Sequence, residues 1–396
     1  MIFAFIVISL RIDQCQAPLN TPPPVPNGHL LHAQIIFRHG ARTPGTNFSD
    51  ISLSGPWYCD DSRAISPRYQ AGPLIHPRIY HEKFDQKMMP YPPSCREQDL
   101  LLLGMQQHFD LGQMYRNYLV GFESNNKLLS NNFCPWEVLV RSTDVDRAIR
   151  STISFLQGLY PPASPNEIIQ IMTDADDAEF LDAPKESCTE LSDLTNYFVD
   201  TPLFKEYFKS FSDKYQEKLE PIIGSWEPSK VKKFTSYVLM VKCTNHTLPS
   251  FYTDELVDDC CNFMAFWHYN THNNDKFRGV ASAPIYREII RMADEFISMK
   301  SSKKLVLVGS HDTELAAMLV TLGYIDKDSA PALRCHFLFE LWDVDRKIMA
   351  RISFNGKPVQ ISFLGNKTIY PYSQFKNEIF RSGLLNHCFV PEWPKY

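Results

Sequence analysis

The sequence has no surplus of positive charge, which a nucleic-acid-binding protein would normally carry. Its 396 residues contain 40 Lys and Arg against 45 Asp and Glu, for a formal net charge of −5. We therefore expect no nucleic-acid partner. Any site for an anion must be built locally, from a few cations that converge in the folded chain.

Long apolar runs are also missing, apart from one at the N-terminus. Residues 1–10 are almost wholly apolar, but this run is shorter than the roughly 20 residues that span a bilayer. Its length suits the core of a signal peptide, so we predict a signal peptide over residues 1–17. A retained apolar tail or a misassigned start is the alternative. The polar C-terminus has no anchor signal, and we expect no stable membrane anchor.

Spacings typical of metal ligands are absent as well. No Cys-X-X-Cys pair occurs, so we expect neither a metal nor another cofactor. The ten cysteines are many for a reducing compartment. With sequons at Asn47, Asn245 and Asn366, they favour a glycoprotein that is secreted or held in the lysosomal lumen. If Cys15 leaves with the signal peptide, an odd number remains, which implies a free thiol or an intermolecular bridge.

Three short apolar runs predict buried strands, over residues 29–37, 136–140 and 304–308. The second and third lead directly into predicted helices over 143–159 and 313–322, the former with Thr143 as its N-cap. The first is separated from a helix over 99–120 by an irregular stretch, residues 45–98. We expect a disulfide between Cys59 and Cys95 to staple that stretch.

The rest of the chain completes an α/β pattern. Residues 165–280 alternate helical patterns with prolines, and show a strand candidate only at 167–173. A helix over 283–299 follows, and 335–342 with 347–354 predict a hairpin. We predict an α/β fold with a mostly parallel sheet, helices on both faces and an inserted helical cap. The core would comprise 18–164 and 282–396, and the cap 165–281.

Each predicted strand ends in residues that can bind or transfer an anion. They are Arg38 with His39, then Arg141, and then His311 with Asp312. In open α/β sheets, ligands bind outside the carboxyl ends of the strands. These residues should therefore converge on one crevice.

The segment 38–44, Arg-His-Gly-Ala-Arg-Thr-Pro, carries the strongest signal. Arg38 and Arg42 flank His39, and arginine forks match the paired oxygens of a phosphate. Nearby positive charge disfavours protonation of His39, and a neutral imidazole is a nucleophile. Gly40 would let the backbone approach a ligand closely. The alternative is a basic loop that pairs with carboxylates.

The other two motifs are weaker when taken alone. Arg141 could simply pair with Asp144 or Asp146, and we interpret Arg147 and Arg150 as solvated helix charges or salt-bridge partners.

The pair His311 and Asp312 could likewise cap a strand and a helix. In the functional hypothesis, His311 donates to a phosphate and Asp312 protonates the leaving oxygen.

These motifs together resemble the histidine acid phosphatases, the branch that holds the prostatic and lysosomal acid phosphatases and the phytases. The resemblance rests on Arg-His-Gly-X-Arg-X-Pro at 38–44 and on the late His-Asp at 311–312. Further segments resemble the animal acid phosphatases in the same order, at 103–108, 141–147, 243–250, 310–313 and 335–341. The resemblance covers residues 29–390 apart from 45–98, which is longer than the family leads us to expect.

The resemblance implies a phosphoglycerate-mutase-like core and an acid phosphatase that hydrolyses small phosphate monoesters without a metal. At the matching positions, His39 would take the phosphoryl group and Asp312 would give a proton to the leaving alkoxide. The phosphoryl oxygens would be held by Arg38, Arg42, Arg141 and His311.

The resemblance also implies disulfides between Cys243 and Cys335 and between Cys188 and Cys388. Members of the family often form homodimers, an assembly that the sequence does not indicate independently. Ala41 stands where the prostatic and lysosomal enzymes often have Asp, which weakens any transfer of substrate preference but not of the reaction.

Three rival hypotheses remain. A phytase, or an inositol or lipid phosphate phosphatase, would share the site, but a phytase pocket should be basic, and the cap has an acidic cluster at 174–179. A secreted, inactive binder of phosphate ligands would be expected to have lost His39, Asp312 or an arginine. A mutase is disfavoured by the cysteines and sequons.

Overall fold

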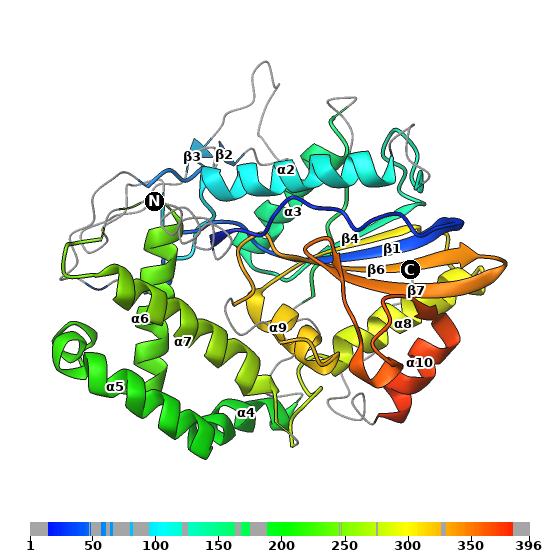
Figure 1. Ribbon diagram of the computed structural model, residues 1–396. Coiled ribbons are helices and arrows are strands. Elements are labelled where there is room, and N and C mark those ends of the chain that lie inside the picture. Colours follow the sequence, from blue (N-terminus) through cyan, green and yellow to red (C-terminus); the bar gives the residue numbers. More distant parts are fainter. Residues whose placement is uncertain are drawn as a thin grey trace, which may run out of the picture.

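A mixed β-sheet lies at the centre of the fold (Figure 1). This computed structural model describes residues 15–46, 48, 57–60, 64–65, 80–81, 95–120, 126–162, 168–174, 188–244, 246, 248–274, 276–325 and 330–382. The strand order is β4-β5-β1-β6-β7-β8, with β9 paired to β7. The strands are β1 (Gly28–Arg38), β4 (Val138–Ser142), β5 (Leu305–Ser310), β6 (His336–Val344), β7 (Lys347–Phe354), β8 (Lys357–Pro358) and β9 (Tyr370–Pro371).

The strands that carry the predicted site residues are parallel neighbours. Strand β5 lies between β4 and β1 and pairs with both in parallel. Strand β6 runs antiparallel to β1, and β7 antiparallel to β6, so β7 points the same way as β1. The predicted mostly parallel α/β sheet and the predicted hairpin are therefore both confirmed.

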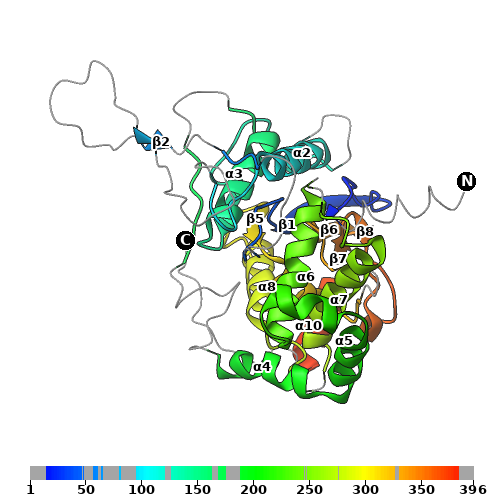
Figure 2. The same cartoon turned by 90° about the vertical axis from the view of Figure 1, so that its left-hand side faces the viewer.

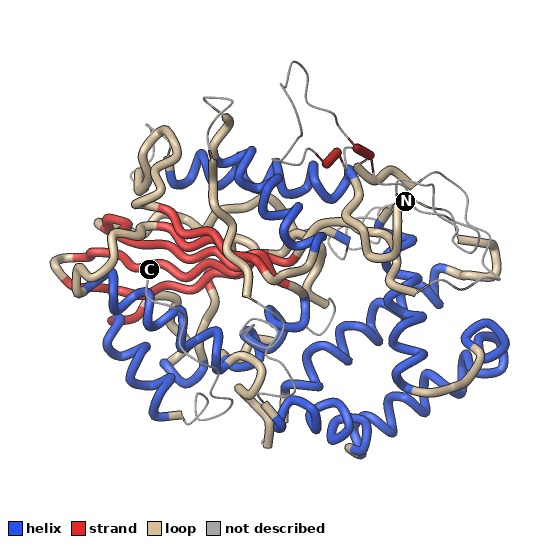
Figure 3. The backbone as a smooth tube through the Cα atoms, turned by 180° about the vertical axis from the view of Figure 1, so that it is seen from behind, coloured by secondary structure: helices blue, strands red, loops and turns tan. Residues whose placement is uncertain are grey.

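Helices cover both faces of this sheet, as Figure 3 also shows from behind. Ile35 and Phe37 of β1 join an apolar cluster with α2 and α3 residues, whereas Ile36 joins a cluster with α8, α9 and α10 residues. Because alternate side chains of a strand point to opposite faces, an uninterrupted apolar run requires a cover on each side. The covering helices are α2 (Leu102–Leu119), α3 (Asp146–Leu159), α8 (Ala283–Ile297), α9 (Asp312–Thr321) and α10 (Tyr372–Arg381).

A group of helices from the middle of the chain gathers at one end of the sheet (Figures 1 and 2). It has its own aromatic core, in which Phe234, Phe263 and Trp267 are buried. Helix α7 packs against α9 and so joins this group to the sheet. The helices are α4 (Thr189–Asp200), α5 (Pro202–Ile223), α6 (Pro228–Cys243) and α7 (Asp254–His272). Their assignment to a separate cap remains a prediction.

Two local predictions are wrong. Thr143 does not cap α3, whose N-cap is Val145 without a side-chain hydrogen bond. Of the strand predicted over 167–173, the described part contributes a single bridge, between Met172 and Arg141. The irregular stretch contains the short strands β2 (Ala64–Ile65) and β3 (Tyr80–His81). In the described ranges, no helix has the length and apolarity to cross a membrane.

Candidate active site

The sheet register brings the three strand-end motifs together. Arg38 is in register with Ser310 of β5, and Ser142 of β4 with Gly309. The residues that follow these positions therefore leave the sheet at the same edge. This is the convergence predicted from the sequence, because parallel neighbours place their carboxyl ends side by side.

His39 is buried at this edge, with 2% of its surface exposed. Its Nδ1 lies 2.9 Å from the Gly40 carbonyl oxygen, so in the neutral ring Nδ1–H donates there and Nε2 keeps the lone pair. Burial holds the pKa of His39 well below its usual value, and the charges of Arg147, Arg38, His311 and Arg42 add to this effect. His39 is therefore a neutral imidazole whose lone pair is on Nε2.

Arg38 joins the first motif to the last. Its Nη2 lies 2.7 Å from Oδ2 of Asp312, and its Nη1 donates to the Pro331 carbonyl oxygen at 2.5 Å. Burial acts to raise the pKa of Asp312, but Arg38, His268, His39 and His311 lower it more strongly. The carboxylate in this structure is therefore ionised.

The His311 ring stands edge-on to that of His39, with centroids 5.5 Å apart. Its Nε2 lies 3.0 Å from the Thr143 hydroxyl. Burial, aided by Arg147, lowers the pKa of His311 to about 3, although Asp312 opposes the shift. Thr143, which we expected to cap a helix, thus orients His311. The buried Nδ1 of His311 has no hydrogen-bond partner among the described residues.

Arg141 is fully buried and pairs through Nη2 with the Asp174 carboxylate. Asp144 and Asp146, the alternative partners considered for Arg141 from the sequence, form no ion pair with it in the described part of the chain. Asp146 instead binds Arg150, at 3.0 Å. In the sequence, Asp174 stands out only as part of the acidic cluster at 174–179. The rest of that cluster lies outside the described residues.

Arg42 and Arg147 complete the positive charge around the two imidazoles. The Nη1 group of Arg42 donates to the Thr43 carbonyl oxygen at 2.9 Å. After burial, Arg147 is the strongest influence lowering the pKa of both His39 and His311. The sequence pattern around Arg147 predicts a solvated helix charge or a salt-bridge partner. Its place in the first turn of a helix that follows a site-bearing strand could have identified it.

The loop after β1 is held by α2 and α3. The Gly40 amide donates to the Ser151 hydroxyl at 3.1 Å, and the Ala41 amide to Gln107 Oε1 at 2.9 Å. A Cβ on Gly40 would lie only 2.4 Å from the Gly104 carbonyl oxygen. The close approach that requires this glycine is therefore to the backbone of α2, whereas we had expected a ligand.

The group α4–α7 also contributes residues beside Asp312, which no pattern in the sequence predicts. His268 of α7 is buried, and its Nε2 lies 3.7 Å from Oδ2 of Asp312. Lys232 of α6 is close enough for Asp312 to influence its pKa, which burial lowers. No strand-end motif marks these residues, and no pattern in the sequence pairs them with position 312.

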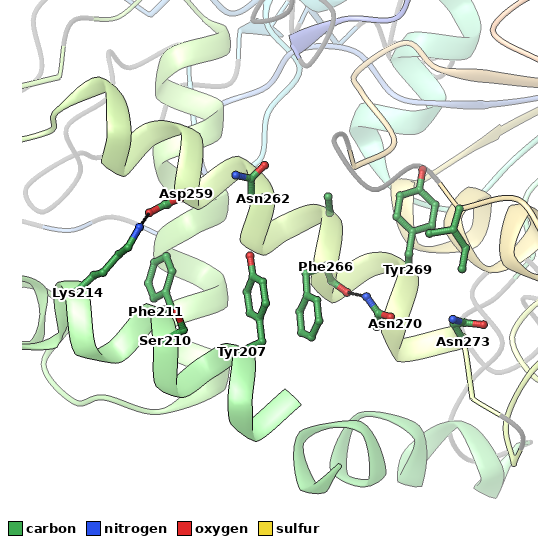
Figure 4. A pocket seen from close by; sticks show the side chains of 12 residues that line it. Tyr207, Ser210, Phe211, Lys214, Asp259, Asn262, Phe266, Tyr269, Asn270 and Asn273 are labelled. Atoms are coloured by element: carbon green, nitrogen blue, oxygen red, sulfur yellow. Dashed lines mark hydrogen bonds and ion pairs between the residues drawn. The ribbon is translucent and has the colours of Figure 1, made fainter. Parts of the chain in front are cut away.

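A separate cavity of about 580 Å³ lies between α5 and α7 (Figure 4). Tyr207 and Phe266 stack there with ring centroids 3.8 Å apart, and Lys214 binds Asp259 at 2.9 Å. Among the described residues that line it, none comes from the strand-end motifs. His268, which lies near Asp312, is not among the residues that line this cavity, so the cavity and the strand-end residues lie on different sides of α7.

The predicted pairing of Cys243 with Cys335 is wrong. Cys243 is bonded to Cys15, with their Cα atoms 5.0 Å apart, and the Cys335 thiol is free and buried. The N-terminal segment runs beside the strand end: the Ala17 amide donates to Leu333 O at 2.9 Å. This pairing carries Cys15 to the end of α6. Signal-peptide cleavage after residue 17 remains a prediction, and residues 1–14 lie outside the described part.

The remaining predicted modifications are two disulfides and three glycosylation sites. The Cys59–Cys95 disulfide is confirmed. Cys188 is disulfide-bonded, while its predicted partner Cys388 lies outside the described residues. Asn366 is exposed, which leaves its sequon accessible. The sequons at positions 47 and 245 have their asparagines outside the described residues.

Known proteins resemble this chain in sequence and in fold. A sequence profile described as "Histidine phosphatase superfamily (branch 2)" matches residues 29–349. Counting factor 60 of Dictyostelium discoideum is 25% identical over 364 residues, 89% of this chain and 86% of that protein. The lysosomal acid phosphatase of Xenopus laevis is 25% identical over 315 residues, 74% of this chain and 69% of that protein.

Solved structures share the fold at lower identity. The phytase of Citrobacter braakii matches with a TM-score of 0.61 and 14% identity, over 89% of this chain and 97% of that one. The apo phytase of Hafnia alvei matches with a TM-score of 0.60 and 13% identity, over 91% and 98%. Since the profile spans all three strand-end motifs and most of the sheet, the chain belongs to branch 2 of the histidine phosphatase superfamily.

Proposed function

We propose that this chain is an acid phosphatase that hydrolyses phosphate monoesters through a phosphohistidine on His39, with Asp312 as the proton donor. One observation carries the proposal: a buried, neutral imidazole and a carboxyl group meet at the arginine-rich edge of the sheet. This combination offers a nucleophile, a proton source and positive charge for a phosphoryl group.

The phosphoryl oxygens would be held by the cations around His39. Arg38 and Arg141 are paired with Asp312 and Asp174 respectively. A phosphoryl dianion carries more charge than either carboxylate and matches the guanidinium fork, so it would displace them as the principal partner. Arg42 and His311 would bind the remaining oxygens.

In the first step, Nε2 of His39 attacks phosphorus while the bond to the leaving oxygen breaks. The proton of Asp312 passes to that oxygen, so an alcohol departs and Asp312 becomes a carboxylate. In the second step, water attacks phosphorus and the N–P bond breaks. Asp312 takes the proton of the water, which restores His39 and yields inorganic phosphate.

The pairing of Arg38 with Asp312 bears on pH dependence. Arg38 lowers the pKa of Asp312 while the two are paired. A bound phosphoryl dianion would draw Arg38 away and place negative charge beside Asp312, and both changes raise its pKa. Protonation would still need acid solution, so activity should fall as the pH rises toward neutrality.

The proposal also covers the cellular compartment in which the protein works. The Cys59–Cys95 disulfide, which the predicted signal-peptide cleavage would leave in place, suits an oxidising compartment. We infer that the protein works in the secretory pathway, either outside the cell or in the lysosomal lumen, on small phosphate monoesters. Glycosylation and a homodimer stay predictions.

The test is hydrolysis of p-nitrophenyl phosphate from acid to neutral pH, with EDTA present, by wild type and His39→Ala. We expect acid-range activity that EDTA does not change and that His39→Ala reduces by about 1000-fold or more. The matched control is His29→Ala, which removes an exposed histidine from the other end of β1.

Two results would overturn the proposal. Full activity in His39→Ala would mean that another group takes the phosphoryl group. A folded wild type that binds inorganic phosphate but hydrolyses no monoester would favour the inactive binder.

A further inference from the structure

Helix α7 presents different chemistry on its two sides. Asn262, Phe266 and Asn273 line the cavity between α5 and α7. On the other side, His268 reaches toward the start of α9, where its Nε2 lies 3.7 Å from Oδ2 of Asp312. The His268 side chain is 5% exposed, and this Nε2 has no hydrogen-bond partner among the described residues. A buried, unsatisfied ring nitrogen aimed at a reacting carboxyl group calls for a ligand.

Lys232 on α6 is the second member of this arrangement. Its Nζ lies 5.1 Å from the centre of the Trp267 ring. Among the described residues, no carboxylate forms an ion pair with it, whereas Lys214, Lys304 and Lys376 each have one. Burial lowers the pKa of Lys232, and the charge of Asp312 acts against that effect. A half-buried ammonium without a counter-ion is ready to bind an anion.

The reaction geometry says which part of a substrate would meet these groups. In-line attack places the leaving oxygen opposite Nε2 of His39, next to the proton donor. Asp312 interacts with two sets of basic groups: His39 and His311 at the sheet edge, and His268 and Lys232 on helices α7 and α6. The alcohol part of the ester would therefore extend toward α6 and α7.

We propose that Lys232 and His268 form a leaving-group subsite, which favours phosphate monoesters whose alcohol carries its own carboxylate or phosphate. Lys232 pairs with that second anion. His268 donates a hydrogen bond to it or to Asp312. This inference rests on the proposed function, because it takes Asp312 as the group beside the leaving oxygen.

A purely structural role for Lys232 makes a different prediction. A lysine can bury its stem against an aromatic ring and gain a cation–π contact without any ligand. Its replacement would then affect all substrates alike. Selectivity between a charged and a neutral leaving group separates the two roles.

The experiment compares 4-carboxyphenyl phosphate with phenyl phosphate, which differ by one carboxylate on the leaving group. The measured quantity is the ratio of their kcat/KM values in wild type, Lys232→Met, Lys232→Arg and His268→Gln. Division by the wild-type ratio removes the intrinsic reactivity of the two esters. We expect Lys232→Met to lower the ratio about tenfold or more, and Lys232→Arg to retain most of it. His268→Gln should lower it by a smaller factor, and added salt should weaken the wild-type preference.

The matched control is Lys233→Met, which removes the neighbouring, exposed lysine of α6. It should leave the ratio unchanged. An unchanged ratio in folded Lys232→Met would overturn the subsite. If that variant does not fold, the wild type still tests the subsite. The absence of a salt-sensitive preference for the carboxylated ester in wild type would overturn it. Failure of the proposed function looks different, because wild type would then hydrolyse neither ester or His39→Ala would hydrolyse both.

Discussion

The Arg38 guanidinium and the Asp312 carboxylate lie 2.7 Å apart, at the ends of two strands far apart in sequence. Strand β1 pairs with β5 in parallel, so residue 38 and residue 312 leave the sheet at the same edge. The pair keeps Asp312 ionised in this structure. In the proposed reaction a phosphoryl group would compete for Arg38, so this contact would couple substrate binding to the protonation of the proposed acid.

Asp312→Asn should affect poor leaving groups most. An alkoxide needs a proton as it departs, whereas p-nitrophenolate leaves readily without one. We expect kcat for glycerol 2-phosphate to fall about 100- to 10,000-fold, and kcat for p-nitrophenyl phosphate to fall much less. Steady-state kinetics on both substrates measures this difference. Asp144→Asn, at an exposed carboxylate beside the end of β4, is the control. Equal losses on both substrates would argue against proton donation by Asp312.

Acid should destabilise the ligand-free protein. Burial lowers the pKa of six histidines from 6.5, to about 4 for His32, His268 and His336 and to about 3 for His108, His272 and His311. Below pH 6.5 the unfolded chain binds protons that the folded chain excludes. The free energy of unfolding therefore falls as the pH falls toward 4.

Thermal melts across this range test the effect. His108 is a suitable site for substitution because its ring packs on Phe37, with centroids 4.8 Å apart, outside the proposed chemistry. His108→Met should make the decline of Tm with acid shallower, by the equivalent of about 1–3 kcal/mol at the acid end. His29→Met, at an exposed histidine, should leave the slope as it is. A Tm that does not change between pH 6.5 and 4 would contradict the expectation.

Gly40→Ala should destabilise the loop that carries His39. The new Cβ would lie 2.4 Å from the Gly104 carbonyl oxygen, and neither backbone can yield without moving α2 or β1. We expect a loss of about 1–3 kcal/mol in the free energy of unfolding, with reduced kcat. Gly45→Ala is the matched control, since the nearest atoms to its Cβ would belong to the flexible Gln98 side chain, at 3.1 Å. Denaturant unfolding of both variants gives the answer, and equal stabilities would contradict this account of Gly40.

The disulfide of Cys243 can be mapped directly. In protein that keeps residue 15, peptides with Cys15 and Cys243 should remain linked until reduction. Burial raises the pKa of Cys335 to about 12, so its thiol should react with alkylating agents only after unfolding. Peptide mass analysis before and after reduction measures both points. A linked pair of Cys243 and Cys335 would instead restore the pairing that the resemblance implied.

Much of the fold could be predicted because its signals are local. The runs 29–37 and 304–308 are largely apolar and end in the uninterrupted apolar stretches 35–37 and 305–308, which suit strands covered on both faces, and the structure has β1 and β5 there. The strand-end motifs follow from the same runs. Parallel pairing then brings Arg38, Arg141 and His311 to one edge without further information.

Other features depended on contacts between distant elements. The sequence by itself determined the α/β class, the family and the strand-end motifs that bring Arg38 and His311 beside His39. Only the tertiary structure decided that Cys15 bonds to Cys243, that Asp174 pairs with Arg141, and that Lys232 and His268 face Asp312. The physical reason is that periodicity reports which face of a segment is buried. It does not report which other segment covers that face, and α7 meets α9 only through tertiary packing.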